Sequence, residues 1–351
     1  MPNNNFFRNK ITIVNAIMCV LVVFLHSHNI DKYGNSAGIG NISLLESFIS
    51  KSLGNLAVPT FFFMSSILFF HNYDLSKIWS KYKSRVFSLM IPFFLWNFLY
   101  MIFFFILINT PLSNAFMDTK EFTVNVRILV DSIFFYRYHG SYWFIYQLIL
   151  FISISPMIYV VMKSSYKIPA VPGLLIISYW LPKIPNIPYG ISIVYLIYWL
   201  LGAYYAMHMR DRIYHRSSKK KIYLTLSLSI VLVLVRFYLE FVNPELKVSE
   251  YVLNLLLFIN VITVWFALDI LKLNIVYGWM KMSFFIYSIH PLIVDMIKKA
   301  IFTLFPQNTA LALSNYIISG IGGILISVCI AKIMIRFSPK TYNILCGGRS
   351  A

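Results

Sequence analysis

Long apolar runs separated by short polar segments dominate the sequence. Most runs are about 20 residues long, the length that a helix needs to cross a hydrocarbon core of about 30 Å. The runs lack the alternation expected of strands, and a helix satisfies its own backbone hydrogen bonds in lipid. The pattern therefore predicts an all-α, polytopic integral membrane protein with about ten transmembrane helices in one bundle. The ten runs are 11–28, 46–70, 86–108, 141–162, 168–181, 191–208, 222–241, 251–271, 282–305 and 310–335.

We expect one membrane-embedded domain over residues 1–351, with spans from about residue 11 to 335 and a tail over 336–351. The segment 122–138 carries Arg127, Asp131 and Arg137, so we interpret it as an amphipathic or re-entrant element. The first run lacks a small-residue cleavage site, which favours a retained helix over a signal peptide.

Composition and charge support a membrane protein. Hydrophobic residues make up 59% and charged residues 12% of the 351 positions, whereas soluble domains carry about 25% charged residues. Most of the 30 Lys and Arg residues fall on one side if both termini are cytoplasmic, as the positive-inside rule predicts for a bacterial plasma membrane. Basic loops facing an anionic leaflet explain the net charge of +18. Nucleic-acid binding would need a basic soluble domain, and the sequence contains none. No metal-ligand spacing is present either.

The first span carries polar residues on one face. Asn15 and His26 are eleven residues apart, about three helical turns, and are separated along the axis by roughly 16 Å. Polar groups inside spans are candidates for function. The alternative is that His26 and His28 are interfacial residues that cap the helix end.

A second intramembrane histidine lies in the ninth span. Tyr287 precedes His290 by about one turn, so both share a helix face, and Pro291 follows. A neutral histidine can act as a general base near pH 7. The alternative is a buried histidine that hydrogen-bonds to Tyr287 or to a neighbouring helix.

The remaining candidates lie on the basic loop before the third span and in aromatic or small-residue stretches. Lys81, Lys83 and Arg85 would receive phosphate groups at the mouth of the bundle, or they would only anchor the loop on the cytoplasmic side. Ser65 and Trp143 would line the pathway of an acceptor. Alternatively, Ser65 permits close helix packing and Trp143 belongs to an interfacial aromatic belt.

The order of these motifs resembles membrane acyltransferase family 3. That family's first helix carries Arg or Lys, then ten intervening residues, then His, a spacing that Asn15 and His26 reproduce. Its second helix has a Pro-x-Phe-Phe-x-x-Ser-Gly-like stretch, and its third begins with Arg-x-x-Arg-x-x-x-Pro. The matching segments here are 59–66, 85–92, Trp143-Phe144 and 283–291. The last of these, Ser-Phe-Phe-Ile-Tyr-Ser-Ile-His-Pro, also resembles the intercellular adhesion protein C-like branch, which modifies an exopolysaccharide.

Three positions depart from the family pattern: Asn15 replaces a cation, Ser66 replaces the glycine of the second helix, and Ser88 replaces the second arginine. Donor contacts would then come from Lys81, Lys83 or the loop 210–221. Other consequences would be a different donor or acyl group, or loss of activity.

The resemblance implies a membrane O-acyltransferase, most simply an acetyl-CoA-dependent O-acetyltransferase. It would move an acyl group from cytoplasmic acyl-CoA to hydroxyls of a cell-surface polysaccharide or lipid-linked glycan. His26, His290 and Tyr287 would be catalytic; Asn15 and Arg85 would contact the donor with the loop lysines; Ser65, Trp143 and His28 would face the acceptor. No cofactor would be permanently bound, because acyl-CoA is a substrate. The alternatives are an exporter of the saccharide and a membrane scaffold subunit.

Overall fold

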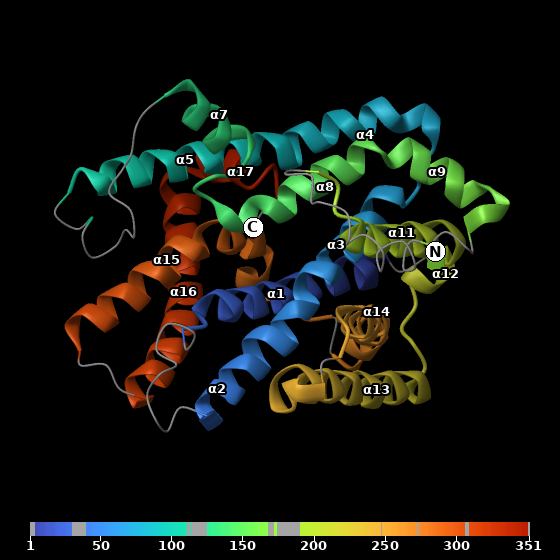
Figure 1. The fold of residues 1–351 in the computed structure, drawn as a ribbon. Helices are drawn as coiled ribbons and strands as arrows, with labels where there is room; N and C mark the ends of the chain where they lie inside the picture. The colour runs from blue at the N-terminus through green and yellow to red at the C-terminus, as the bar shows by residue number, and fades with distance from the viewer. Residues whose placement is uncertain are drawn as a thin grey trace.

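The computed structural model describes residues 4–29, 40–110, 113, 125–167, 172–173, 190–246, 248–271, 274–305 and 309–349. Within these ranges the chain forms helices and no strands, which confirms the all-α fold class (Figure 1). The α-helices are α1 (Asn4–Ser27), α2 (Gly40–Ser47), α3 (Ala57–Phe70), α4 (Ile78–Arg85), α5 (Ile91–Ile108), α7 (Val126–Phe134), α8 (Trp143–Ser153), α9 (Ser155–Lys163), α11 (Ile193–His208), α12 (Arg210–Ile213), α13 (Lys219–Phe237), α14 (Glu250–Ala267), α15 (Ser283–Leu304), α16 (Thr309–Phe337) and α17 (Pro339–Leu345).

The membrane-spanning character of the helices is confirmed, but the number ten is not. Seven helical segments of the described chain are long and apolar enough to cross a bilayer. The predicted run 141–162 forms two helices, α8 and α9, that meet at an angle of 57°, and counting this bent pair as one span gives eight. Helix α11 is apolar but has only 16 residues. The predicted run 168–181 lies almost entirely outside the described residues.

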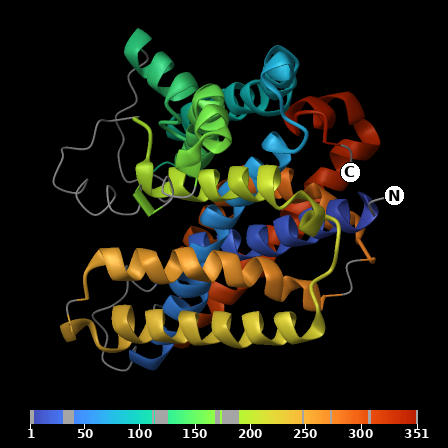
Figure 2. The ribbon, with the colours of Figure 1, turned by 90° about the vertical axis from the view of Figure 1, so that its right-hand side faces the viewer.

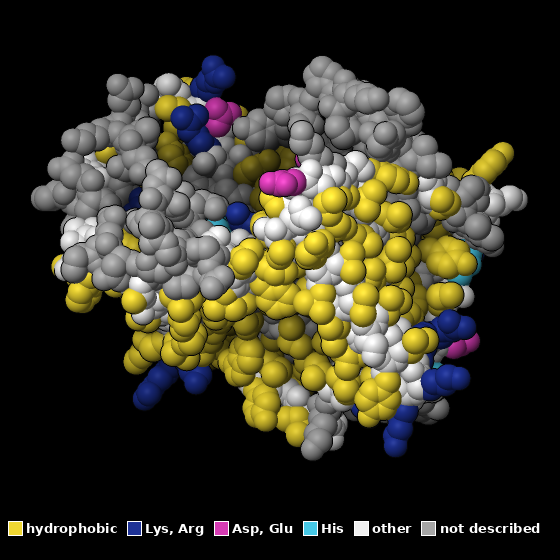
Figure 3. Space-filling view, turned by 60° about the horizontal axis from the view of Figure 1, so that its bottom comes forward, with side chains coloured by type: hydrophobic (Ala, Val, Ile, Leu, Met, Phe, Trp, Pro, Cys, Tyr) yellow, Lys and Arg dark blue, Asp and Glu magenta, His cyan; other side chains and the backbone are white. Residues whose placement is uncertain are grey.

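The surface is apolar where the helices would face lipid. Figure 3 shows a broad hydrophobic face, with lysine and arginine side chains gathered toward its edges. Only 28% of the apolar windows of α13 and of α16 is buried inside the protein. Leu224, Val231 and Leu325 are among the exposed apolar side chains. Since water would not tolerate so large an apolar area, this face fits a hydrocarbon environment.

Helix α1 runs through the middle of the molecule, with α15 and α16 on one side and α3 and α14 on the other (Figures 1 and 2). Near its first turns, the buried Lys10 forms an ion pair of 2.7 Å with the buried Asp269, which follows α14. Asp269 also accepts a hydrogen bond of 3.0 Å from the Ser217 backbone N–H. Because buried charges are stable only when they are paired, this pair fixes α1 against α14 and the segment before α13.

Small residues let α3 and α11 cross closely. A side chain at Gly202 would place its Cβ only 2.4 Å from the Phe63 carbonyl oxygen. The Ser66 hydroxyl donates a 2.5 Å hydrogen bond to the Trp199 carbonyl. Ser66, the residue that stands in place of the family-like glycine, therefore serves helix packing. The other end of the fold is equally tight, because a Cβ at Gly320 of α16 would lie 2.7 Å from the Phe24 ring.

Candidate active site

A cavity of about 830 Å³ opens beside the start of α1 and the C-terminal residues, where Arg8, Gly348 and Arg349 line it. Figure 2 shows both termini on that side of the molecule. Residues of α1, α3, α8 and α15 form its walls, and the C-terminal residues after α17 complete them. This volume is within the range of about 300–1,000 Å³ that is typical of sites for small molecules and cofactors. The cavity is therefore the strongest candidate for a substrate site in the described structure.

One face of α1 lines this cavity from the helix start inward. Arg8, Thr12, Asn15 and Cys19 line it at intervals of three or four positions and so lie along a single stripe, and the adjacent Asn9 and Ile11 also contribute to the lining. His26 follows Cys19 by seven residues, or about two turns. The same stripe therefore leads from the mouth of the cavity to the imidazole of His26.

The lining of the cavity is cationic. Arg8, Arg85, Lys281 and Arg349 contribute to it, and the described lining residues include no Asp or Glu. The described part of the chain also provides no ion pair for any of these four cations. A cavity of this kind attracts an anionic ligand, and arginine is suited to bidentate binding of phosphate.

Two histidines lie just beyond the inner end of the cavity. The rings of His26 and His290 have centroids 5.1 Å apart. His290 is fully buried, and its Nδ1 donates a 3.1 Å hydrogen bond to the Ile286 carbonyl. In the neutral ring the lone pair then lies on Nε2, which has no hydrogen-bond partner among the described residues. One turn earlier, Tyr287 lines the cavity and donates its hydroxyl to the Ser141 carbonyl.

A third histidine, His139, belongs to the same polar group. Its Nε2 donates a 2.9 Å hydrogen bond to the Ser288 carbonyl, so its Nδ1 can accept from the Ser141 hydroxyl at 3.2 Å. The rings of Tyr100 and Tyr142 contact the imidazole from two directions, each with its centroid 3.8 Å away. His139 is thus held rigidly by its neighbours.

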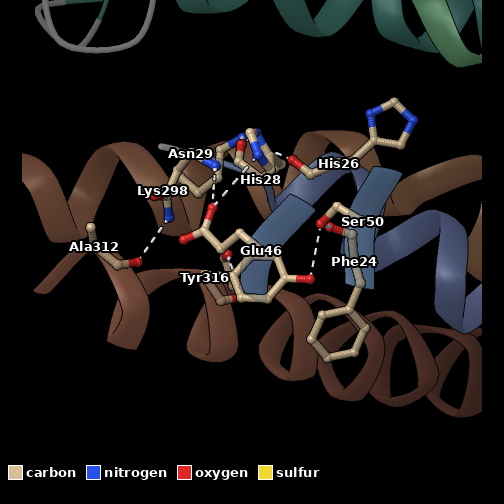
Figure 4. Close-up of polar contacts among 10 residues, drawn as sticks. Phe24, His26, His28, Asn29, Glu46, Ser50, Lys298, Ala312 and Tyr316 are labelled. Atoms are coloured by element: carbon tan, nitrogen blue, oxygen red, sulfur yellow. Dashed lines mark hydrogen bonds and ion pairs between the residues drawn. The ribbon is translucent and has the colours of Figure 1, made fainter. Parts of the chain in front are cut away.

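The outer end of α1 is held by Lys298 of α15. Its Nζ donates hydrogen bonds to the carbonyls of His26 (2.8 Å) and His28 (3.3 Å). These carbonyls lack helical partners, and a cation there also complements the helix dipole. Figure 4 shows the His26 imidazole turned away from this polar group. Lys298 therefore holds the backbone of His26, and the His26 imidazole faces the ring of His290.

The buried carboxylate of Glu46 completes the outer polar group. One of its oxygens accepts a 3.2 Å hydrogen bond from the Asn29 backbone N–H and lies 4.0 Å from His28 Nε2. Close by, the Ser50 hydroxyl bonds to the Phe24 carbonyl and to the Tyr316 hydroxyl, at 2.9 Å each (Figure 4). These contacts join the end of α1 to α16 and to the segment after α2.

A family model described as an acyltransferase domain matches residues 8–332, which is most of the chain. The chain belongs to acyltransferase family 3. The predicted resemblance to this family is thereby confirmed, and the protein is a membrane acyltransferase. Comparison with curated proteins and with solved structures finds no match of significance.

The structure separates the acyltransferase's predicted donor-binding residues into two groups. Asn15 and Arg85 line the cavity. Lys81 instead donates hydrogen bonds to the carbonyls of Phe69 (2.9 Å) and His71 (3.2 Å), where it caps the end of α3. Lys83 is exposed and lies outside the cavity lining.

The predicted acceptor-side residues also occupy different surroundings. Ser65 lines the cavity. Trp143 packs against Tyr195, with ring centroids 4.9 Å apart, so it belongs to a packed aromatic group of the acyltransferase. His28 lies beside Glu46 at the outer end of α1. Of the predicted catalytic residues, only Tyr287 lines the cavity. The His290 ring lies 6.0 Å from the Tyr287 ring and 5.1 Å from the His26 ring, so the fold brings the three together, with both histidines beyond the lining.

Sequence reasoning missed His139 and gave Arg349 no role. His139 follows the segment interpreted as amphipathic, in a His-Gly-Ser-Tyr stretch that runs directly into Trp143. The position of His139 only four residues before Trp143, a predicted site residue, was the signal that could have indicated it. Arg349 follows two glycines, Gly347 and Gly348, after the last span. A Gly-Gly pair predicts a turn, but it does not say where the turn directs the next side chain.

Proposed function

We propose that this acyltransferase is an O-acyltransferase, most simply an O-acetyltransferase, that takes its acyl group from acyl-CoA on the cytoplasmic side. The acceptor is a hydroxyl of a cell-surface polysaccharide or lipid-linked glycan. The observation that carries the proposal is the cationic cavity, which ends beside Tyr287, one turn before His290 and its partner His26. A phosphate-rich donor and a hydroxyl acceptor would meet at this point.

The cations set the direction of the donor. The phosphate groups of CoA are anionic, so they would lie at the mouth among Arg8, Arg85 and Lys281. The narrower pantetheine arm would extend along the α1 stripe past Asn15 and Cys19. The thioester would then lie near Tyr287. In this proposal the protein lies in a cell membrane, with the cavity mouth and both termini on the cytoplasmic side.

The histidines supply the proton transfer. His26 takes the proton of the acceptor hydroxyl as the oxygen attacks the thioester carbon, and the new C–O ester bond forms as the C–S bond breaks. The proton then passes to the CoA thiolate, which leaves as the thiol. His290 presents its Nε2 lone pair beside the His26 ring and orients that imidazole. Tyr287 lies beside this position, and its hydroxyl would turn from the Ser141 carbonyl to donate a hydrogen bond to the oxyanion that develops on the acyl carbonyl.

Mass spectrometry of the surface polysaccharide, from cells with and without the protein, tests this proposal. We expect glycan chains that carry the mass of ester-linked acyl groups only when the protein is present, and that lose it on mild alkaline treatment. An exporter would instead change the amount of surface polysaccharide and leave the acyl content per chain unchanged. That second result would overturn the proposal.

A further inference from the structure

The C-terminal segment of the chain is folded against the cavity. Tyr342, Leu345 and Cys346 are buried, and the Trp96 indole N–H of α5 donates a 3.1 Å hydrogen bond to the Leu345 carbonyl. The Tyr342 ring packs on Phe285 of α15, with centroids 5.5 Å apart. Helix α17 is therefore docked on α5 and on α15, and α15 lines the cavity.

Two glycines after α17 turn the chain toward the cavity. Gly347 and Gly348 have φ values of +62° and +76°, which side chains other than glycine rarely allow. The Gly348 N–H donates a 2.8 Å hydrogen bond to the Asn343 carbonyl, which closes the end of α17. A Cβ on Gly347 would lie 2.4 Å from the Ser88 carbonyl oxygen. Both the conformation and the close approach require glycine at this position.

The turn places the Arg349 side chain in the cavity wall. Its Nη1 donates hydrogen bonds of 2.9 Å to the carbonyls of Ser88 and Cys346, and the guanidinium lies 4.1 Å from the Phe284 ring centroid. Nη1 is thereby used twice, whereas Nε and Nη2 make no hydrogen bond to any described residue. A guanidinium has five N–H donors, so three of them are available to a ligand.

The charge at this point is not neutralised by the protein. Arg85 also lines the cavity, and no carboxylate pairs with either arginine in the described residues. Burial, together with the nearby Arg85, lowers the pKa of Arg349 to about 10, so the group still carries its charge at neutral pH. Two adjacent cations without an acid form a site for a multiply charged anion.

We propose that Arg349 is a donor-binding residue, which the C-terminal tail inserts beside Arg85 to bind phosphate groups of the acyl-CoA. The assignment rests on the proposed function. Arg349 lies outside the residues 8–332 that match the family model. The guanidinium bonds to the backbone of Ser88, the position at which the family-like pattern carries a second arginine. An arginine from the far end of the chain thus restores a cation to the place where the sequence lacks one.

Calorimetric titration of the purified full-length protein with CoA and with pantetheine tests the assignment. Pantetheine lacks the nucleotide and its phosphates. We expect R349A to weaken CoA affinity about ten- to hundredfold, because a charge-assisted hydrogen bond is worth about 1.5–3 kcal/mol. R349K should lose less, since it keeps the charge but not the planar fork. Pantetheine affinity should not change in either variant.

K340A is the matched control, because Lys340 is an exposed cation on the same tail and lies outside the cavity lining. It should bind CoA as the wild type does and keep the wild-type melting temperature. For R349A and R349K, the unchanged pantetheine affinity shows that the site is still folded. If R349A binds CoA like the wild type, or loses pantetheine affinity equally, the assignment is wrong while the proposed function stands. A wild type that binds no CoA would overturn the proposed function, and this assignment with it.

Discussion

Two regions beside α1 differ in whether their charged side chains have a partner of opposite charge. At the outer end, Lys298 lies 3.5 Å from Asp295 and His28 lies 4.0 Å from Glu46. Beside the N-terminal part of α1, Arg85 and Arg349 line a cavity whose described residues include no Asp or Glu. The first group resembles a scaffold that holds the helix end, and the second resembles a site for an anionic ligand.

The difference follows from the cost of removing charge from water. A buried ion is tolerated when a partner or several hydrogen bonds compensate it. Lys10 shows the paired case even beside the cavity, since it lies 2.7 Å from Asp269. Arg85 and Arg349 have no acidic partner among the described residues, and the proposed anionic donor would supply one. Substitutions at the two kinds of charge should therefore change different measurements.

The largest expected effect is at the histidine beyond the cavity. H26A should lower the rate of acyl transfer by about 10²–10⁴-fold, because it removes the proton acceptor. CoA affinity should be retained, since the cations that bind the phosphates are untouched. The rate is measured as transfer of radiolabelled acetyl to the glycan. Unchanged transfer by a folded H26A protein would refute the role of His26.

The second largest effect should be on stability. K10A leaves Asp269 buried without its partner, and the loss of one member of a buried ion pair costs about 3–5 kcal/mol. We expect a clearly lower unfolding temperature in detergent. The double variant K10M/D269L removes both charges and should recover much of the loss. If K10A alone unfolds at the wild-type temperature, the pair does not hold α1 in place.

Arg85 and Lys83 form a matched pair two residues apart. R85A should weaken CoA binding by about 1.5–3 kcal/mol, the value of a hydrogen bond to a charged group. K83A should bind CoA like the wild type, because Lys83 is exposed and outside the cavity. Equal losses in both variants would mean that the loop attracts the donor only through its overall charge.

The smallest effect should come from the outer scaffold. E46Q keeps an oxygen that can accept from the Asn29 N–H, so we expect a loss of about 0.5–1.5 kcal/mol in unfolding free energy. CoA affinity should be unchanged. The unfolding temperature and a CoA titration measure the two quantities separately. A loss of CoA affinity in E46Q would show that the two ends of α1 are coupled.

The sequence predicted the parts of this fold that depend on local pattern. Apolar runs predicted the helices, and because α1 is continuous from Asn4 to Ser27, the eleven-residue spacing puts Asn15 and His26 on one side of it. Local sequence pattern could not show that the run 141–162 bends, because the break between α8 and α9 depends on tertiary packing. The motifs around Ser65 and His290 indicated the walls of the site.

Long-range contacts explain what sequence reasoning could not assign. Lys81 belongs to a basic cluster that suggested phosphate binding, yet its Nζ caps α3. Arg349 is 261 positions away from Ser88 along the chain, so no local pattern connects them. His139 reaches the other histidines only because its loop folds onto Ser288 of α15. Residues of this kind become visible only when the helices are assembled.

The most direct test of the central claim is acyl transfer across a membrane that contains only this protein. Purified protein is reconstituted in vesicles, radiolabelled acetyl-CoA is supplied on the side of the cavity mouth, and a saccharide acceptor on the other side. We predict ester-linked label on the acceptor, formed by the wild type and lost in H26A. If the protein binds CoA but no label reaches the acceptor, the proposed acyl transfer through this site is contradicted.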